Sequence, residues 1–206
     1  SIKKDFGIIV APPGLGKTII ALNIIALKQQ KALVIVHRKQ IAEQWVEKIK
    51  TFLDIPKNEI GIIGQGKAKV GKCITVAIIK SLTKWVDSEN ELEKNKFGII
   101  VIDECHHIAS KTFRDTVSKI PTYYLYGLTA TPFRKYNDQK LIFSNIGEII
   151  VSLQSQIIEN DNLGINIIIR NTQFNIPYNS KTDNFEILSK SLIYDSTRNK
   201  LILNDV

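Results

Sequence analysis

The sequence predicts an α/β fold with a mostly parallel sheet that is covered by helices on both faces. Short, nearly continuous apolar runs alternate along the chain with segments whose apolar residues recur at helical spacing. Apolar runs without polar alternation are typical of strands buried on both faces. Strands that alternate with helices are typical of a parallel sheet, because each parallel connection needs a crossover segment.

The expected elements follow one another in a regular order. Strands are expected over residues 8–11, 32–37, 74–79, 97–102 and 123–128. Helices are expected over residues 18–27, around apolar positions 41, 45 and 49, over residues 82–86, and over residues 110–120. The order is thus strand and helix in turn, from the first apolar run to about residue 128.

Beyond Pro132 the pattern weakens. The sequence at 160–164, Asn-Asp-Asn-Leu-Gly, is a turn-rich break that precedes a β-branched stretch at 165–169. Helical spacing returns at 184–204. We therefore expect one domain over residues 1–164 and a separate segment over residues 165–206.

Charge and composition limit the classes of protein. The 206 residues have a net charge of +8, and residues 1–150 hold 23 basic and 14 acidic side chains (23 − 14 = +9). This excess is compatible with a polyanionic partner and equally with a merely soluble surface. The apolar stretch near the N-terminus is interrupted by Pro12, Pro13 and Lys17, so we expect no membrane span.

Two cysteines, Cys73 and Cys105, are too few for a disulfide framework in a chain of this length. There is no signal-peptide pattern, so we expect a cytoplasmic or otherwise intracellular protein. Methionine is absent even at position 1, which leads us to expect a fragment of a longer chain.

The segment from Ala11 to Thr18 reads Ala-Pro-Pro-Gly-Leu-Gly-Lys-Thr and joins an expected strand to an expected helix. Its glycines let successive N–H groups point into one concavity, and a helix N-terminus favours an anion. Lys17 can reach the β and γ phosphates of a nucleotide, and the Thr18 hydroxyl can bind Mg²⁺. The segment predicts a phosphate-binding loop rather than an ordinary glycine-rich turn. Its binding residues are Pro13, Gly14, Leu15, Gly16, Lys17 and Thr18.

Two carboxylates, Asp103 and Glu104, directly follow an expected strand. Ligands of open α/β sheets bind at the carboxyl ends of the strands. Asp103 is suited to hold Mg²⁺, directly or through a water, and Glu104 to polarise a water aimed at a γ phosphate. The adjacent Cys105, His106 and His107 do not predict zinc, because three consecutive residues cannot converge on one ion.

Four segments occur in the order and rough spacing of motifs I, Ia, II and III of superfamily 2 helicases and translocases. They are Gly14-Leu15-Gly16-Lys17-Thr18, Val34-Ile35-Val36-His37-Arg38 with Gln44-Trp45, Asp103-Glu104-Cys105-His106, and Gly127-Leu128-Thr129-Ala130-Thr131-Pro132. Over residues 7–134 the sequence resembles the first RecA-like domain, a P-loop NTPase fold, of that superfamily. The second and fourth segments resemble the branch of repair helicases, phage helicases and restriction-enzyme motor subunits.

The resemblance implies that Lys17, Asp103 and Glu104 are catalytic and that Thr18 and Asp103 serve Mg²⁺. It also implies a link between the ATP site and the nucleic-acid surface. The linking residues would be His106, Thr129 and Thr131. His107 has no secure counterpart in the motif.

A basic segment after the second expected strand is the candidate nucleic-acid contact. His37 and Arg38 stand at a strand end, where packing explains them poorly, and the family's role for them is contact with the phosphate backbone. We expect Lys39 and Lys80 to make further contacts with phosphates. The family often has Thr and Gln where this sequence has Ile78 and Lys80. Lys80 can still contact a phosphate, whereas the Ile78 side chain cannot.

The aromatic residues of the sequence are better explained by packing than by contact with nucleic-acid bases. Trp45 and Trp85 lie at helical spacing with other apolar residues, which indicates core packing rather than base stacking. Tyr123, Tyr124 and Tyr126 are expected to alternate on a strand.

We therefore expect the ATP-binding motor domain of an ATP-dependent nucleic-acid helicase or translocase, acting on DNA rather than RNA. A second RecA-like domain would complete the site, with residues 165–206 as the linker and its truncated start. The alternatives are a non-hydrolysing module in which ATP switches nucleic-acid affinity, and the motor subunit of a restriction enzyme. No adenine-recognising segment or motif IV to VI is found, so this half of a motor is expected to hydrolyse ATP slowly.

Overall fold

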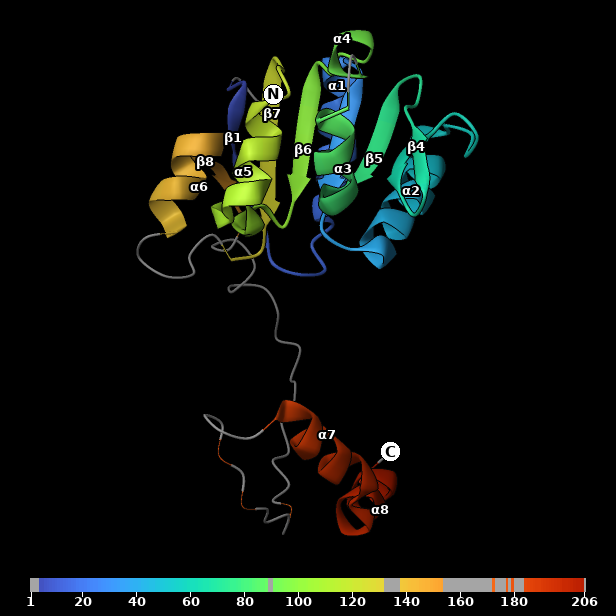
Figure 1. Ribbon diagram of the computed structural model, residues 1–206, viewed down its shortest axis with the longest axis vertical. Coiled ribbons are helices and arrows are strands. Elements are labelled where there is room, and N and C mark those ends of the chain that lie inside the picture. The colour runs from blue at the N-terminus through green and yellow to red at the C-terminus, as the bar shows by residue number, and fades with distance from the viewer. Residues whose placement is uncertain are drawn as a thin grey trace. The chain divides into compact units, whose positions relative to one another are not determined.

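The computed structural model divides the chain into two compact units, residues 1–161 and 162–206 (Figure 1). It describes residues 4–88, 91–131, 138–153, 172, 177, 179 and 184–205. The turn-rich break at 160–164 and the β-branched stretch at 165–169 lie outside the described residues. The domain boundary at residue 164 therefore stays a prediction.

The first unit is built on an eight-stranded sheet with the order β4-β3-β5-β2-β6-β7-β1-β8. Its strands are β1 (Phe6–Val10), β2 (Ala32–Val36), β3 (Gly61–Gly64), β4 (Lys67–Lys69), β5 (Ile74–Ile78), β6 (Ile99–Asp103), β7 (Tyr124–Thr129) and β8 (Ile149–Ser152). All neighbouring pairs are parallel except β3 and β4, which form an antiparallel hairpin. The predicted mostly parallel sheet is confirmed.

Helices cover both faces of this sheet (Figure 1). They are α1 (Lys17–Lys28), α2 (Lys39–Leu53), α3 (Ile79–Val86), α4 (Glu91–Lys94), the 3₁₀ helix η1 (Cys105–Ala109), α5 (Lys111–Ser118) and α6 (Asp138–Ile146). Leu22 of α1 and Trp45 of α2 belong to the core on one face, and Leu82 of α3 and Phe113 of α5 to the core on the other. Successive strand residues alternate between the two cores, which explains the unbroken apolar runs.

The sequence patterns missed several short elements. The hairpin of β3 and β4 has two glycines in its first strand and an exposed Lys-Ala-Lys in its second, so neither strand gives a strong apolar signal. The elements α6 and β8 lie beyond Pro132, where the pattern weakens. Tyr124 and Tyr126 share one face of β7, whereas Tyr123 precedes the strand and is exposed.

The second unit contains two described helices, α7 (Phe185–Tyr194) and α8 (Ser196–Asp205). The helical spacing expected over residues 184–204 is therefore confirmed, although the chain breaks the helix at Asp195, whose backbone is extended. None of the helices that the structure describes has the length and apolar character needed to cross a membrane.

Parallel pairing places the loops that follow β1, β2, β5, β6 and β7 at one edge of the sheet, which we call the carboxyl edge. These loops, with the strand ends and helix starts beside them, hold the predicted phosphate-binding loop, His37 with Arg38, Lys80, the carboxylate pair, and Thr131. All the segments that the sequence singled out for function thus emerge on the same side.

Candidate functional site

The glycine-rich loop connects β1 to α1. Its first residue, Ala11, donates its N–H to the carbonyl of Thr129 at 3.0 Å, which fixes the start of the loop against β7. Gly14 and Gly16 have φ angles of 86° and 72°, in the left-handed region that favours glycine. A Cβ at Gly14 would meet no atom within 4 Å, so the loop is open there. The loop leads straight into the N-terminus of α1, with Gly16 as the N-cap.

Two lysines lie at this helix N-terminus. Lys17 Nζ donates to the carbonyl of Ala11 at 3.2 Å, which holds the ammonium group back over the loop. Lys48 Nζ, from α2, donates to Thr18 Oγ1 at 3.3 Å. Sequence reasoning missed Lys48, because it lies 30 residues from Thr18 and only the packing of α2 beside α1 brings them together.

Asp103 is the last residue of β6, and both of its carboxylate oxygens accept a hydrogen bond. Trp45 Nε1 donates to Oδ2 at 2.8 Å, and the N–H of Glu104 donates to Oδ1 at 3.0 Å. Trp45 is 1% exposed. The prediction that Trp45 is a core residue is confirmed, but the packed indole also orients the carboxylate. The pair Gln44-Trp45 within the second motif was the only sequence signal for this contact.

Glu104 follows in the left-handed region, with a φ of 51° that is unusual for a residue other than glycine. His106 Nδ1 lies 3.3 Å from Glu104 Oε2 and 3.3 Å from Thr129 Oγ1. The hydroxyl of Thr129 donates to the carbonyl of Thr131 at 3.1 Å, so it accepts from His106. His106 therefore contacts both the carboxylate and β7, and the three predicted linking residues His106, Thr129 and Thr131 lie together.

The turn after β6 packs closely under β7. Cys105 is fully buried, and a Cβ at Gly127 would lie 2.8 Å from its Sγ, so only glycine allows this approach. Burial, with a smaller effect of the Glu104 carboxylate, raises the pKa of Cys105 to about 12. The sulfur is therefore a neutral thiol that serves packing.

The four predicted nucleic-acid residues divide into two groups. Arg38, Lys39 and Lys80 are exposed at the ends of the neighbouring strands β2 and β5. Lys39 pairs with Glu43 across one helical turn at 3.7 Å. His37 instead turns inward, and its ring centroid lies 4.6 Å from that of His107. Burial, together with the charge of Arg38, lowers the pKa of His37 below its ordinary value.

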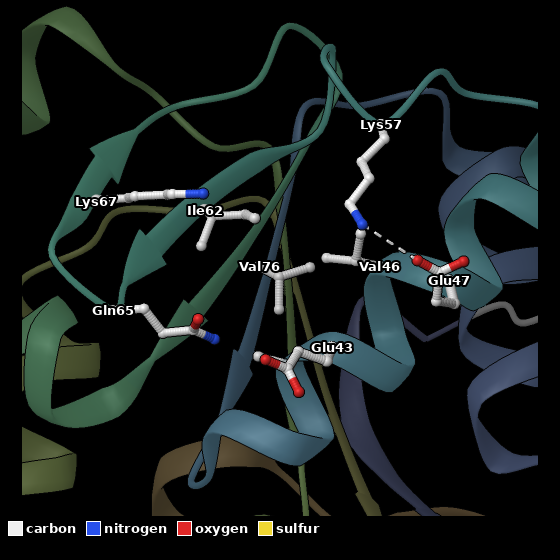
Figure 2. A pocket seen from close by; sticks show the side chains of 9 residues that line it. Glu43, Val46, Glu47, Lys57, Ile62, Gln65, Lys67 and Val76 are labelled. Carbon is white, nitrogen blue, oxygen red and sulfur yellow. Dashed lines mark hydrogen bonds and ion pairs between the residues drawn. The ribbon is translucent and has the colours of Figure 1, made fainter.

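A pocket of about 170 Å³ lies between α2 and the β3–β4 hairpin (Figure 2). Ile62 and Val76 contribute apolar surface to it, and at its rim Lys57 pairs with Glu47 at 3.4 Å. The phosphate-binding loop and the carboxylate pair do not line it. This pocket is therefore separate from the site at the carboxyl edge.

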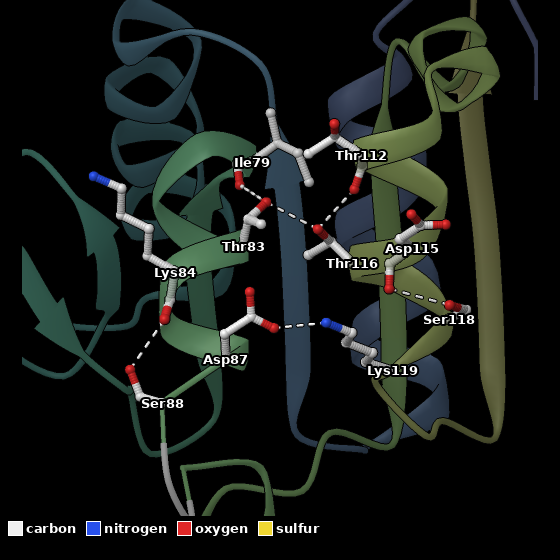
Figure 3. A network of polar contacts seen from close by, with 10 residues as sticks. All are labelled: Ile79, Thr83, Lys84, Asp87, Ser88, Thr112, Asp115, Thr116, Ser118 and Lys119. Atoms are coloured by element: carbon white, nitrogen blue, oxygen red, sulfur yellow. Dashed lines mark hydrogen bonds and ion pairs between the residues drawn. The ribbon is translucent and has the colours of Figure 1, made fainter.

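On the opposite face of the sheet, a polar network joins α3 to α5 (Figure 3). The hydroxyls of Thr83 and Thr116 lie 2.8 Å apart, and Lys119 pairs with Asp87 at 2.6 Å. The helix α3 contains Lys80, and α5 directly follows the turn that holds Glu104. The network thus ties a predicted nucleic-acid element to the element behind the carboxylates.

Comparison with known proteins places this arrangement in a family. The model of the family described as type III restriction enzyme, res subunit, matches residues 2–134. The DNA 3'-5' translocase XPB2 of Sulfurisphaera tokodaii is 34% identical over 149 residues, which cover 72% of this chain and 32% of that protein. The probable helicase D10 of Escherichia phage T5 is 34% identical over 131 residues, which cover 64% of this chain and 28% of that protein.

A similar fold occurs in the UvsW helicase from bacteriophage T4, with a TM-score of 0.58 and 21% identity over 71% of this chain and 54% of that one. The matched part of the chain spans less than a third of the length of each of the two curated relatives, the translocase XPB2 and the helicase D10. The expected resemblance to the first RecA-like domain of superfamily 2 helicases and translocases is confirmed, and the chain belongs to the family described as type III restriction enzyme, res subunit.

Proposed function

We propose that this chain is the ATP-binding motor domain of a DNA helicase or translocase driven by hydrolysis of Mg-ATP. The observation that supports this best is the convergence, at one edge of the sheet, of an open glycine-rich loop with a lysine and a pair of fixed carboxylates. Relatives named as DNA translocase and helicase favour DNA as the polymer.

The loop fits a nucleotide's phosphates. Gly14 and Gly16 hold backbone conformations that turn N–H groups toward a common centre, and α1 adds the positive end of its dipole. Lys17 supplies a cation on a flexible stem, and Lys48 adds a second beside Thr18. We infer that Pro13 and Leu15 contribute to the shape of the loop and not through their side chains, since both side chains are exposed and have no polar group.

The Thr18 hydroxyl and the Asp103 carboxylate are hard oxygen donors of the kind that Mg²⁺ prefers. Each Asp103 oxygen accepts one hydrogen bond and keeps a lone pair for a metal or a metal-bound water. When bound, Mg²⁺ would neutralise charge on the β and γ phosphates.

Glu104 is proposed as the general base. It would accept a proton from the water that attacks the γ phosphorus, while the bond from that phosphorus to the oxygen of ADP breaks in line. His106 holds Oε2 of Glu104 from one side, which limits the positions that the carboxylate can take. Because His106 also bonds Thr129, a movement of β7's end toward or away from the site would shift the base.

Arg38, Lys39 and Lys80 are proposed to contact the phosphate backbone of the nucleic acid. All three are exposed cations, which suits sequence-independent contact with phosphates. We further propose that a second RecA-like domain closes over the carboxyl edge, and that the protein works inside the cell.

Two variants test the ATP site. Lys17→Ala should abolish binding of Mg-ATP, because it removes the cation proposed to hold the phosphates. The fold should stay intact, because the ammonium group's hydrogen bond is to the carbonyl of Ala11 in the same loop. Glu104→Gln should keep Mg-ATP binding but lower hydrolysis by about 10²- to 10⁴-fold, the usual contribution of a general base. Binding is measured with a fluorescent ATP analogue and turnover by phosphate release in the full-length protein.

The pair also decides between hydrolysis and switching. If the unmodified protein binds ATP and changes its DNA affinity without releasing phosphate, the non-hydrolysing module is correct and the motor is not. Undiminished turnover in Lys17→Ala would contradict the assignment of the phosphate-binding loop. Circular dichroism of each variant checks that the fold is unchanged.

A further inference from the structure

Three imidazoles stand in a row between the nucleotide site and the end of β2. The ring centroids of His37 and His107 are 4.6 Å apart, and those of His107 and His106 are 4.3 Å apart. The interplanar angles are 42° and 43°, so the rings are tilted against one another by similar amounts. His107 is the middle member of the row. It directly follows the motif Asp103-Glu104-Cys105-His106, and the family resemblance assigns it no role.

The two ends of this row differ in what they contact. At one end, His106 Nδ1 lies within 3.3 Å of both Glu104 Oε2 and Thr129 Oγ1. At the other end, His37 directly precedes Arg38, the N-cap of α2 and a proposed phosphate contact. The row therefore connects the proposed general base to a segment proposed to hold nucleic acid.

Core packing alone does not account for the row. The Nδ1 atom of His37 is buried and has no hydrogen-bond partner among the described residues. A buried polar atom without a partner lowers stability, and an apolar ring of similar size would avoid that loss. A metal site is also disfavoured, since no group of three His, Cys, Asp or Glu side chains within the described part of the chain is arranged to hold an ion.

We propose that His107 is a positioning residue that couples phosphate contact at the start of α2 to the placement of Glu104. A shift of His37, when Arg38 takes hold of a phosphate, is passed by ring contact to His107 and then to His106. Because His106 is bonded to Glu104, the base moves with it. This inference rests on the proposed function, and it adds a second route from nucleic acid to the ATP site beside that through Thr129.

The test compares His107→Ala with His107→Phe in the full-length protein. The readout is the ratio of ATP turnover with and without a DNA duplex. His107→Ala should lower that ratio by about 10-fold, within the range usual for coupling between sites, with the basal rate and the KM for ATP within about two-fold. His107→Phe keeps a ring at the middle position and should keep most of the stimulation. If both variants lose basal and stimulated turnover equally, His107 is structural and the proposal is wrong.

A double variant tests the route itself. If His37 and His107 act in one row, His37→Ala with His107→Ala should lower the stimulation no further than the more damaging single variant. Fully additive losses would contradict the route.

A measurement without turnover separates this inference from the proposed function. In ¹H–¹⁵N spectra of the histidine rings, a DNA duplex should shift the His106 signals in the unmodified protein and shift them clearly less in His107→Ala, where only the route through Thr129 remains. Shifts of the same size in the variant and in the unmodified protein overturn the inference while the motor assignment stands. If the unmodified protein does not turn over ATP, the motor assignment is wrong. If it does turn over ATP, but DNA neither stimulates the turnover nor shifts the His106 signals, the coupling alone is wrong.

Discussion

The two functional parts of the carboxyl edge are built in opposite ways. Around the proposed nucleotide site, which we call the fixed part, Asp103 accepts hydrogen bonds on both oxygens, and the Glu104 carboxylate is held by His106, whose side chain is only 8% exposed. At the proposed nucleic-acid surface, which we call the open part, Arg38 and Lys80 are exposed side chains at strand ends.

This contrast follows from what each part must do. Hydrolysis needs a base and a metal ligand at fixed positions, because a small misplacement raises the barrier steeply. A phosphate backbone can be held by charges that adapt to it, since the attraction depends weakly on direction. Packing therefore organises the first part, and charge alone organises the second.

The largest expected effect concerns the second RecA-like domain that we propose. Arginines of a partner domain commonly accelerate phosphoryl transfer by about 10³- to 10⁵-fold. Arg114 cannot serve, because its guanidinium donates to the carbonyl of Ala109, and Arg134 lies outside the described residues. We expect residues 1–206 alone to hydrolyse ATP at least about 10³-fold more slowly than the full-length protein with saturating Mg-ATP and DNA. Equal rates would show that this domain holds a complete site.

The next effect concerns the bond that orients Asp103. Trp45→Phe removes the Nε1 donor and keeps an aromatic ring in the core. A hydrogen bond to a charged group is typically worth about 1.5–3 kcal/mol, so we expect turnover to fall by about 10- to 100-fold through the loss of Asp103's orientation. The measurement is steady-state phosphate release at saturating Mg²⁺.

Trp85→Phe is the matched control. Trp85 is 5% exposed, and its Nε1 has no hydrogen-bond partner among the described residues. The same change there removes an indole of similar burial without touching a carboxylate, so turnover should stay within about two-fold. Equal losses in both variants would mean that repacking, and not the bond to Asp103, causes the effect.

The contrast also explains what the sequence could predict. Local patterns predicted the central strands, and short motifs singled out Lys17, Asp103 and Glu104 as candidate site residues, because each motif follows an apolar run. The bond between Trp45 and Asp103 spans 58 residues, and the contact of His37 with His107 spans a similar stretch. No local pattern contains such pairs, since they depend on the strand order β2-β6 and on the placement of α2.

A smaller effect is expected at the open part. Arg38→Ala should weaken DNA binding a few-fold, by similar factors on unrelated sequences, and lower the slope of log K against log salt by about one. Lys39→Ala should change less, because Lys39 already pairs with Glu43. Binding is measured by fluorescence anisotropy from low to moderate salt.

Lys94→Ala provides the control for charge. Lys94 is exposed in α4, which precedes β6 and so lies toward the opposite edge of the sheet. The substitution Lys94→Ala removes the same net charge as Arg38→Ala and should leave the affinity for DNA nearly unchanged. If Lys94→Ala weakens binding as much as Arg38→Ala, overall charge rather than the carboxyl edge holds the DNA.

The smallest expected effect falls on His37, where the two parts meet. Burial, reinforced by Arg38 and opposed by Asp103, lowers the pKa of His37 below its ordinary value of 6.5. The unfolded chain therefore takes up a proton at this residue before the folded protein does, so this contribution to stability is complete above about pH 7.5 and decreases as the pH falls through 6.5 toward the lower folded pKa. His37→Phe has no group to titrate there and keeps a ring against His107. Urea unfolding midpoints should therefore fall less between pH 7.5 and pH 5.5 in the variant than in the unmodified protein, with the comparison at pH 8 serving as the reference for repacking. Parallel pH profiles would show that burial does not oppose the protonation of His37, and that the fixed part does not extend to the end of β2.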